Sequence, residues 1–155
     1  MFNFEKVNKD NFNHVVEIVN SNEEYNRLEN GSPYRTEKEI KEEFLYEDSN
    51  RHTYYIKDGT NFIGLIDYID KNPNDGHTWL GLLMTHGSYH KQGYGKRAYQ
   101  EFEYSIKNKG CRNLRIGIIP QNHNAEKFWK SIDFKFYEQK KSTTGLVVNC
   151  YEKQL

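Results

Sequence analysis

The feature that most constrains the fold is a change of hydrophobic period between residues 77 and 118. Residues 77–85 are rich in apolar and β-prone side chains, and we expect the end of this strand to be buried on both faces. Residues 93–110 then show a four-residue step, and residues 114–118 alternate again before Pro120. A strand, a crossover helix and a second strand in this order predict a parallel pair in one sheet. The apolar residues of the helical step are Tyr94, Ala98, Phe102 and Ile106.

The other segments predict hairpin-forming strands and amphipathic helices around this unit. Asp58-Gly59 and residues 72–76 have turn composition, so the central strands are expected to pair antiparallel. Residues 21–33 are polar and are expected to form a loop or a broken helix, and residues 140–145 to form a turn. Strands are expected at 2–7, 53–57, 62–69, 134–138 and 146–151, and helices at 12–19, 36–44 and 125–132. We therefore expect an α/β (mixed α+β) fold with helices on both faces of the sheet, in a single domain spanning 1–155.

Composition excludes several classes of protein. The 155 residues carry 22 basic and 22 acidic side chains, which argues against a nucleic-acid binder. No apolar run is long enough to span a membrane, and the first residues lack the apolar core of an export signal. The two cysteines, Cys111 and Cys150, suit a reducing compartment. We expect a cytoplasmic protein without a membrane or nucleic-acid partner.

The most informative segment is the glycine-rich turn at residues 89–98, which reads YHKQGYGKRA. Backbone N–H groups at such a turn and at the start of the following helix can converge on a phosphate or pyrophosphate. A Walker loop is set aside because Arg97 stands where Ser or Thr is required. The short dinucleotide fingerprint matches Gly93, Gly95 and Ala98, but residues 112–115 lack its acidic residue. A glycine-capped helix without a ligand is a further alternative.

Two motifs in residues 83–134 resemble the GNAT N-acetyltransferase superfamily. The superfamily's pyrophosphate-binding signature, Gln/Arg-x-x-Gly-x-Gly/Ala, matches residues 90–95, with His90 at the position usually taken by Arg or Gln. Its second motif, Asn-x-x-Ala-x-x-Phe-Tyr-x-x-x-Gly-Phe, matches residues 122–134, with Trp129 and Asp133 as departures. The resemblance implies a mostly antiparallel seven-stranded sheet whose central parallel strands splay apart, and acetyl-CoA as the co-substrate.

The resemblance also implies which residues hold the cofactor and act in transfer. The oxyanion donor is expected to be a backbone N–H of Leu83, Met84 or Thr85, with Met84 as the catalytic position. Trp129 occupies the place of the usual general acid and cannot protonate a thiolate, so Tyr137 is a possible substitute and the unprotonated thiolate an alternative leaving group. Asn122 is expected either to bond the pantetheine arm or to cap a helix. The expected cofactor-binding residues are Leu83, Met84, Thr85, His90, Lys91, Gln92, Gly93, Tyr94, Gly95, Lys96 and Asn122.

No general base stands out, and the candidates are Asp67, His77 and His86. The histidines and cysteines show no metal-binding spacing, so no metal is expected. Residues 1–50 hold 6 basic and 12 acidic side chains. By resemblance the acceptor lies over the first two helices, where carboxylates and aromatic rings would suit a cationic amine. These lining candidates are Glu23, Glu24, Glu29, Tyr25 and Tyr34.

The function expected from the resemblance is transfer of an acetyl group from acetyl-CoA to a primary amine of a small molecule or peptide, by direct attack in a ternary complex. The alternatives are a non-catalytic acyl-CoA-binding module and a nicotinamide-dependent enzyme. The chain is expected to be a monomer or a homodimer, with residues 146–151 as an edge strand that can pair between subunits.

Overall fold

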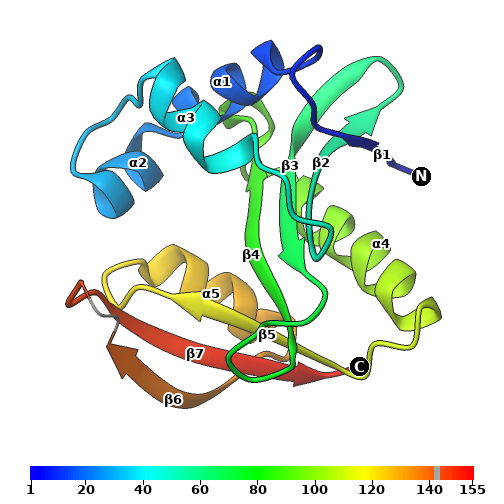
Figure 1. Ribbon diagram of the computed structural model, residues 1–155, viewed down its shortest axis with the longest axis vertical. Coiled ribbons are helices and arrows are strands. Elements are labelled where there is room, and N and C mark those ends of the chain that lie inside the picture. Colours follow the sequence, from blue (N-terminus) through cyan, green and yellow to red (C-terminus); the bar gives the residue numbers. More distant parts are fainter. Residues whose placement is uncertain (142–143) are drawn as a thin grey trace.

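The computed structural model describes residues 1–141 and 144–155 and contains a seven-stranded sheet with helices on both faces (Figure 1). Its strand order is β1-β2-β3-β4-β5-β7-β6, and each neighbouring pair is antiparallel except β4–β5. This confirms the predicted mixed, mostly antiparallel sheet. The strands are β1 (Asn3–Lys6), β2 (Arg51–Asp58), β3 (Asn61–Ile69), β4 (Thr78–Thr85), β5 (Asn113–Ile118), β6 (Lys135–Lys141) and β7 (Val147–Gln154). The helices are α1 (Asn13–Asn20), α2 (Glu23–Asn30), α3 (Glu37–Phe44), α4 (Tyr94–Asn108) and α5 (His123–Ser131), with a short 3₁₀ turn η1 (Gly87–Tyr89).

Two hydrophobic clusters lie on opposite faces of this sheet. One joins the sheet to α4 and α5 through residues that include Leu80, Phe102, Ile116 and Trp129. The other joins it to α1 and α3 through residues that include Ile18, Ile40, Leu65 and Met84. The crossover helix α4 starts after the αL residue Gly93 and ends before Gly110, as the four-residue step predicts.

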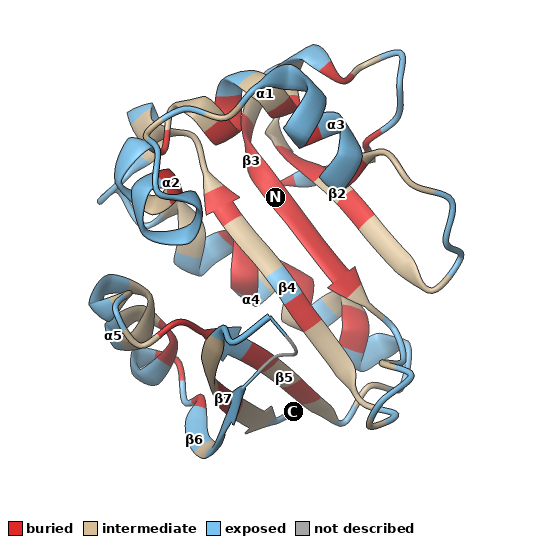
Figure 2. Cartoon of the chain, turned by 60° about the vertical axis from the view of Figure 1, so that its left-hand side comes forward, coloured by how far each residue is buried: buried red, intermediate tan, exposed pale blue. Residues whose placement is uncertain are grey.

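The central parallel strands splay apart. In the described chain, the β4–β5 ladder is confined to Thr78↔Leu114 and Trp79↔Arg115, although β4 continues to Thr85 and β5 to Ile118. Figures 1 and 2 show the two strands diverging from this closed end. The splay leaves one edge of β4 without a strand neighbour over most of its length.

The splay corrects the expectation that the end of β4 is buried on both faces. Leu80 and Met84 are buried, but Gly81 is exposed and Leu82 and Leu83 are half-buried. The reason is the open edge, which removes the cover that a fully paired central strand would have (Figure 2).

Two further expectations need correction or completion. The expected edge strand 146–151 belongs to β7, which pairs with both β5 and β6, so the C-terminal edge of the sheet is β6. Within the expected loop 21–33 lies the two-turn helix α2, which has acidic residues in its first turn and ends at the αL residue Gly31. The expected turn 140–145 falls partly outside the described residues. None of the described helices combines the length and apolarity needed to cross a bilayer.

Candidate active site at the splayed strands

A β-bulge in β4 sets the direction of its backbone groups. Tyr68 pairs with Leu80 and Asp67 pairs with Leu82, so Gly81 is the additional residue on β4. The bulge turns Leu82 toward the α1–α3 face, although Leu80 packs on the α4–α5 face. Side-chain alternation then continues, with Leu83 on the α4–α5 face and Met84 on the α1–α3 face.

The hydrogen-bond alternation of the β3–β4 ladder identifies the amides on the open edge. The His86 N–H donates to Ile63 O at 2.7 Å, and Thr85 is directly opposite Gly64. Since hydrogen-bonded and non-hydrogen-bonded pairs alternate, Met84 bonds β3, whereas the backbones of Leu83 and Thr85 face the splay. Of the three expected oxyanion donors, Leu83 and Thr85 therefore direct their N–H groups toward the open side, and the Met84 N–H belongs to the ladder.

The glycine-rich turn lies between the end of β4 and the start of α4. Lys91 and Gly93 both adopt left-handed conformations, with φ of 58° and 81°. A Cβ atom at Gly93 would meet no heavy atom within 4 Å, so glycine is needed there for its φ and not for space. Residues 90–93 are exposed, and the turn is therefore open to a ligand.

The amides of this turn are available for a ligand. The first intrahelical bond of α4 at its N-terminus runs from Arg97 N to Gly93 O at 3.1 Å. Within residues 1–141 and 144–155, no hydrogen bond from the amides of residues 92–96 to a protein group is found. Successive unpaired N–H groups at a helix N-terminus form an anion-binding concavity, which fits the pyrophosphate of coenzyme A.

Side chains hold the turn against β4. The His90 Nε2–H donates to Thr85 O at 3.1 Å, and the Asn22 amide nitrogen donates to the same carbonyl at 2.9 Å. The Gln92 amide nitrogen donates to Ser88 O at 3.0 Å. His90, which departs from the family motif, therefore has a structural contact that links the turn to the open strand.

The second motif forms α5 and its ends. Asn122 Oδ1 accepts a hydrogen bond from Ala125 N at 3.1 Å, which is an N-cap. Trp129 is buried, with ring centroids 5.5 Å from Tyr99 and 5.2 Å from Phe134, both edge to face. At the place of the family's glycine, Asp133 takes φ = 77° and completes a Schellman C-cap.

The sequence family is decided by a comparison with family models. Residues 15–134 match the model described as Acetyltransferase (GNAT) family. The chain belongs to the GNAT acetyltransferase family. The match includes the open strand, the glycine-rich turn and α5, and it confirms the resemblance carried by the two motifs. No curated protein matches the chain.

Solved GNAT structures share the whole fold at low sequence identity. An acetyltransferase from Thermus thermophilus has a TM-score of 0.84 at 19% identity, covering 100% of this chain and 97% of that one. A GNAT acetyltransferase from Elizabethkingia anophelis with acetyl-CoA bound has a TM-score of 0.70 at 13% identity, covering 99% and 98%. The ribosomal-protein-S18-alanine N-acetyltransferase from Escherichia coli has a TM-score of 0.72 at 11% identity, covering 99% and 94%. These likenesses show the GNAT fold.

Tyr137 lies toward the closed end of the splay. Its ring centroid is 4.6 Å from the Arg115 guanidinium, and Arg115 pairs with Trp79 in the short parallel ladder. Loss of solvent on burial raises the pKa of Tyr137 above its ordinary value. The catalytic role of Tyr137 stays a prediction.

The three candidate bases lie in three different parts of the structure and do not form one catalytic group. Asp67 is buried and accepts from Arg51 Nη2 and from Thr53 Oγ1, both at 2.7 Å, so its charge is already satisfied. His77 precedes β4 and lies 3.1 Å from Asn113 Oδ1, at the opposite end of the strand from the turn. His86 Nδ1 accepts from Ser88 N at 3.0 Å, which leaves its Nε2 near Glu17 at 3.5 Å. No described group of three or more His, Cys, Asp or Glu side chains could hold a metal ion.

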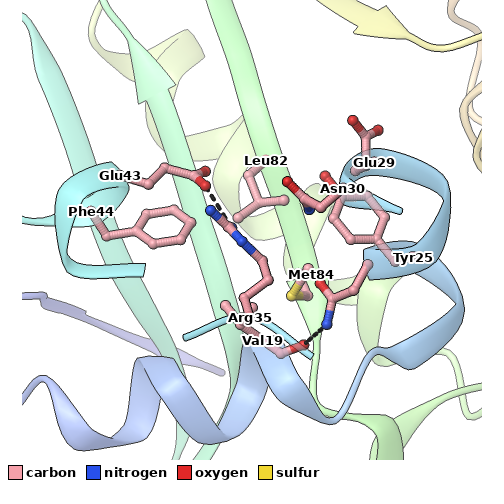
Figure 3. Close-up of a pocket in the computed structure, with 10 residues that line it drawn as sticks. Val19, Tyr25, Glu29, Asn30, Arg35, Glu43, Phe44, Leu82 and Met84 are labelled. Carbon is pink, nitrogen blue, oxygen red and sulfur yellow. Dashed lines mark hydrogen bonds and ion pairs between the residues drawn. The ribbon is translucent and has the colours of Figure 1, made fainter. Parts of the chain in front are cut away.

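A polar pocket of about 100 Å³ lies between α2, α3 and β4, and we call it the α2–α3 pocket. Figure 3 shows Glu43 and Tyr25 on either side of the Arg35 side chain, above β4. Of the expected acceptor-lining residues, the half-buried Tyr25 and the exposed Glu29 line this pocket, whereas Glu23, Glu24 and Tyr34 are exposed outside it. No local sequence pattern marks the other lining residues, because they come from separate elements. The pocket is lined by Val19, Tyr25, Asn26, Glu29, Asn30, Arg35, Glu43, Phe44, Leu82 and Met84.

Proposed function

We propose that the protein is an N-acetyltransferase that moves the acetyl group of acetyl-CoA to a primary amine in a ternary complex. The observation that carries this proposal is the continuity between the unpaired amides of residues 92–96 and the open edge of β4. One part of this surface suits a pyrophosphate, and the other suits an extended chain that carries amide groups. Family membership supports the same chemistry.

The proposed cofactor contacts follow the direction of the backbone groups. The amides of residues 92–96 would hold the pyrophosphate, with Lys91 and Lys96 supplying positive charge beside it. The Leu83 carbonyl and the Thr85 N–H would pair with the pantetheine amides, because the Thr85 carbonyl already accepts from His90 and Asn22. Asn122 uses its Oδ1 as a helix cap, so its amide nitrogen would be the group that reaches the pantetheine arm. Met84 and Tyr94 flank these contacts. His90 would position the glycine-rich turn through its hydrogen bond to Thr85 O.

Acetyl transfer then needs one bond formed and one bond broken. The neutral amine nitrogen attacks the thioester carbon, and the carbonyl oxygen becomes an oxyanion that the Leu83 N–H stabilises. When this intermediate collapses, the C–N bond remains, the C–S bond breaks, and the electron pair leaves on sulfur. A thiol with a pKa of about 8.5 can leave as thiolate near neutral pH, so the buried Trp129 need not act as an acid. The proton of the amine passes to solvent.

A non-catalytic acyl-CoA-binding module is the second candidate. Two observations favour it. Trp129 packs in the core at the place of the usual acid, and the Asp67 carboxylate already accepts hydrogen bonds from Arg51 and Thr53, so it is not free to act as a base. Calorimetric titration with coenzyme A, followed by a thiol-release screen over primary amines, separates the two functions. Binding with turnover supports the transferase, binding without turnover supports the module, and binding of NADH in place of coenzyme A contradicts both.

We also propose a cytoplasmic location, which the free thiols of Cys111 and Cys150 support.

A further inference from the structure

A buried side chain in the α2–α3 pocket has an unused hydrogen-bond acceptor. Asn26 has 0% exposure, and its amide nitrogen donates to Val19 O and Pro33 O, both at 2.9 Å. These two bonds use both N–H groups and fix the orientation of the amide. In the described part of the chain, Asn26 Oδ1 has no partner, although the residue lines the pocket. Arg35 Nε, from the same lining, is likewise buried without a hydrogen-bond partner in the described residues, so the pocket leaves one acceptor and one donor unsatisfied and can take a ligand group that donates to Asn26 Oδ1.

The charges around this oxygen indicate that the donor is a cation. Arg35 Nη1 lies 2.6 Å from the Glu43 carboxylate, so these two charges compensate one another. Among the residues that the structure describes, neither an ion pair nor a side-chain hydrogen bond engages the Glu29 carboxylate. Loss of solvent, and then the negative charge of Glu43, raise the pKa of Glu29. A positive group in the pocket would relieve this repulsion and donate to Asn26 Oδ1.

The pocket lies close to the proposed point of transfer. Leu82 and Met84 line the pocket on the α1–α3 face of β4, and they flank Leu83, whose N–H points into the splay where the proposed thioester would lie. Two residues of a strand span about 7 Å, so a short aliphatic chain can reach from the α2–α3 pocket to the proposed transfer point beside Leu83. The volume of about 100 Å³ is below the roughly 150 Å³ of a cavity that takes up one benzene, which favours an alkylammonium group over a ring.

We propose that the α2–α3 pocket binds a second, non-reacting ammonium group of the acceptor, and that the substrate class is a short aliphatic diamine. This inference rests on the proposed acetyltransferase function. Glu29 and Asn26 Oδ1 receive the ammonium, and Arg35 holds Glu43 in place beside them. The other amine of the substrate, which is the reacting one, then lies at the open edge of β4, where it loses its proton to solvent and attacks the thioester carbon.

The test compares 1,4-diaminobutane with butylamine as acceptors in a thiol-release assay. We expect the wild-type protein to show a KM for the diamine at least tenfold below that for the monoamine. Glu29→Gln should raise the KM for the diamine about tenfold. Glu24→Gln removes the same charge from an exposed position of the same helix outside the pocket, so it serves as the matched control and should leave both KM values unchanged.

The outcomes distinguish this inference from the proposed function. Turnover of both amines with equal KM, or a KM for the diamine that Glu29→Gln does not change, overturns the inference and leaves the transferase standing. Absence of thiol release despite coenzyme A binding contradicts the transferase. In that case, calorimetric titration of 1,4-diaminobutane into the coenzyme A complex determines whether the α2–α3 pocket binds an ammonium group. Binding that Glu29→Gln weakens about tenfold supports an ammonium site. Absence of binding means that water satisfies Asn26, and this overturns the inference.

Discussion

Replacing Leu83 with proline should remove the proposed oxyanion donor while keeping the strand. The Leu83 N–H faces the splay, so its loss breaks no bond of the β3–β4 ladder. Thr85 presents the next amide on the same edge, about 7 Å away, which is too far to replace a hydrogen bond to the same oxygen. One donor is therefore lost without compensation.

The expected magnitude follows from that single donor. Removal of one oxyanion-hole hydrogen bond lowers kcat by about 100- to 1,000-fold, or about 3–4 kcal/mol of transition-state stabilisation. Leu83→Ala is the matched control, because it removes the same half-buried side chain but keeps the N–H. Met84→Pro is the structural comparison, because its N–H belongs to the ladder with β3 and its loss should destabilise the fold.

The assay is thiol release from acetyl-CoA with an acceptor found in the amine screen, together with chemical denaturation of each variant. The account predicts that Leu83→Pro loses at least 100-fold in kcat relative to Leu83→Ala, at similar free energy of unfolding. If the two Leu83 variants turn over at the same rate, the Leu83 amide is not the oxyanion donor, and the proposed path of the thioester along β4 is wrong.

Three further predictions concern the fold and the missing acid. Asp133→Gly should stabilise the protein by about 1 kcal/mol, because Asp133 holds φ = 77° at a C-cap, and a lower melting temperature in thermal unfolding would contradict this. Gly64→Ala should lower the free energy of unfolding by about 1–3 kcal/mol, because its Cβ would clash with the Met84 carbonyl oxygen. Gly81→Ala is the control, because a Cβ there finds its nearest atom at 3.6 Å. Equal denaturation midpoints for the two variants would refute the packing argument. Trp129→Tyr and Trp129→Phe should show the same kcat, because the thiolate leaves without an acid, and a tenfold advantage of the tyrosine variant would show that protonation limits the rate.

Local sequence patterns predicted the elements that form the cofactor side of the site. The four-residue step of α4 and its flanking glycines identified the crossover helix, because an amphipathic helix with glycine boundaries carries its signal within one segment. The two motifs identified the family for the same reason. For residues 21–33 the sequence leaves a loop and a broken helix as alternatives, because the residues of α2 are mostly polar and bury little of the helix.

The bulge and the pocket had no such local signal. The extra residue at Gly81 is defined only by its register with β3, and it decides which amides of β4 face the splay. The α2–α3 pocket brings Glu29, Arg35 and Glu43 together from separate elements, so their proximity depends on how α2 and α3 pack over β4. The pairing of β7 between β5 and β6 is likewise a long-range choice that hydrophobic periodicity does not encode.

Amide resonances give the most direct test of the central claim that the backbone of residues 92–96 binds the pyrophosphate of coenzyme A. In a ¹⁵N–¹H titration of the labelled protein with coenzyme A, the account predicts saturable shifts at these amides and at Leu83 and Thr85. Pantetheine, which lacks the pyrophosphate, should leave residues 92–96 unshifted. Saturable binding of coenzyme A that shifts other amides and leaves residues 92–96 unchanged would contradict the account.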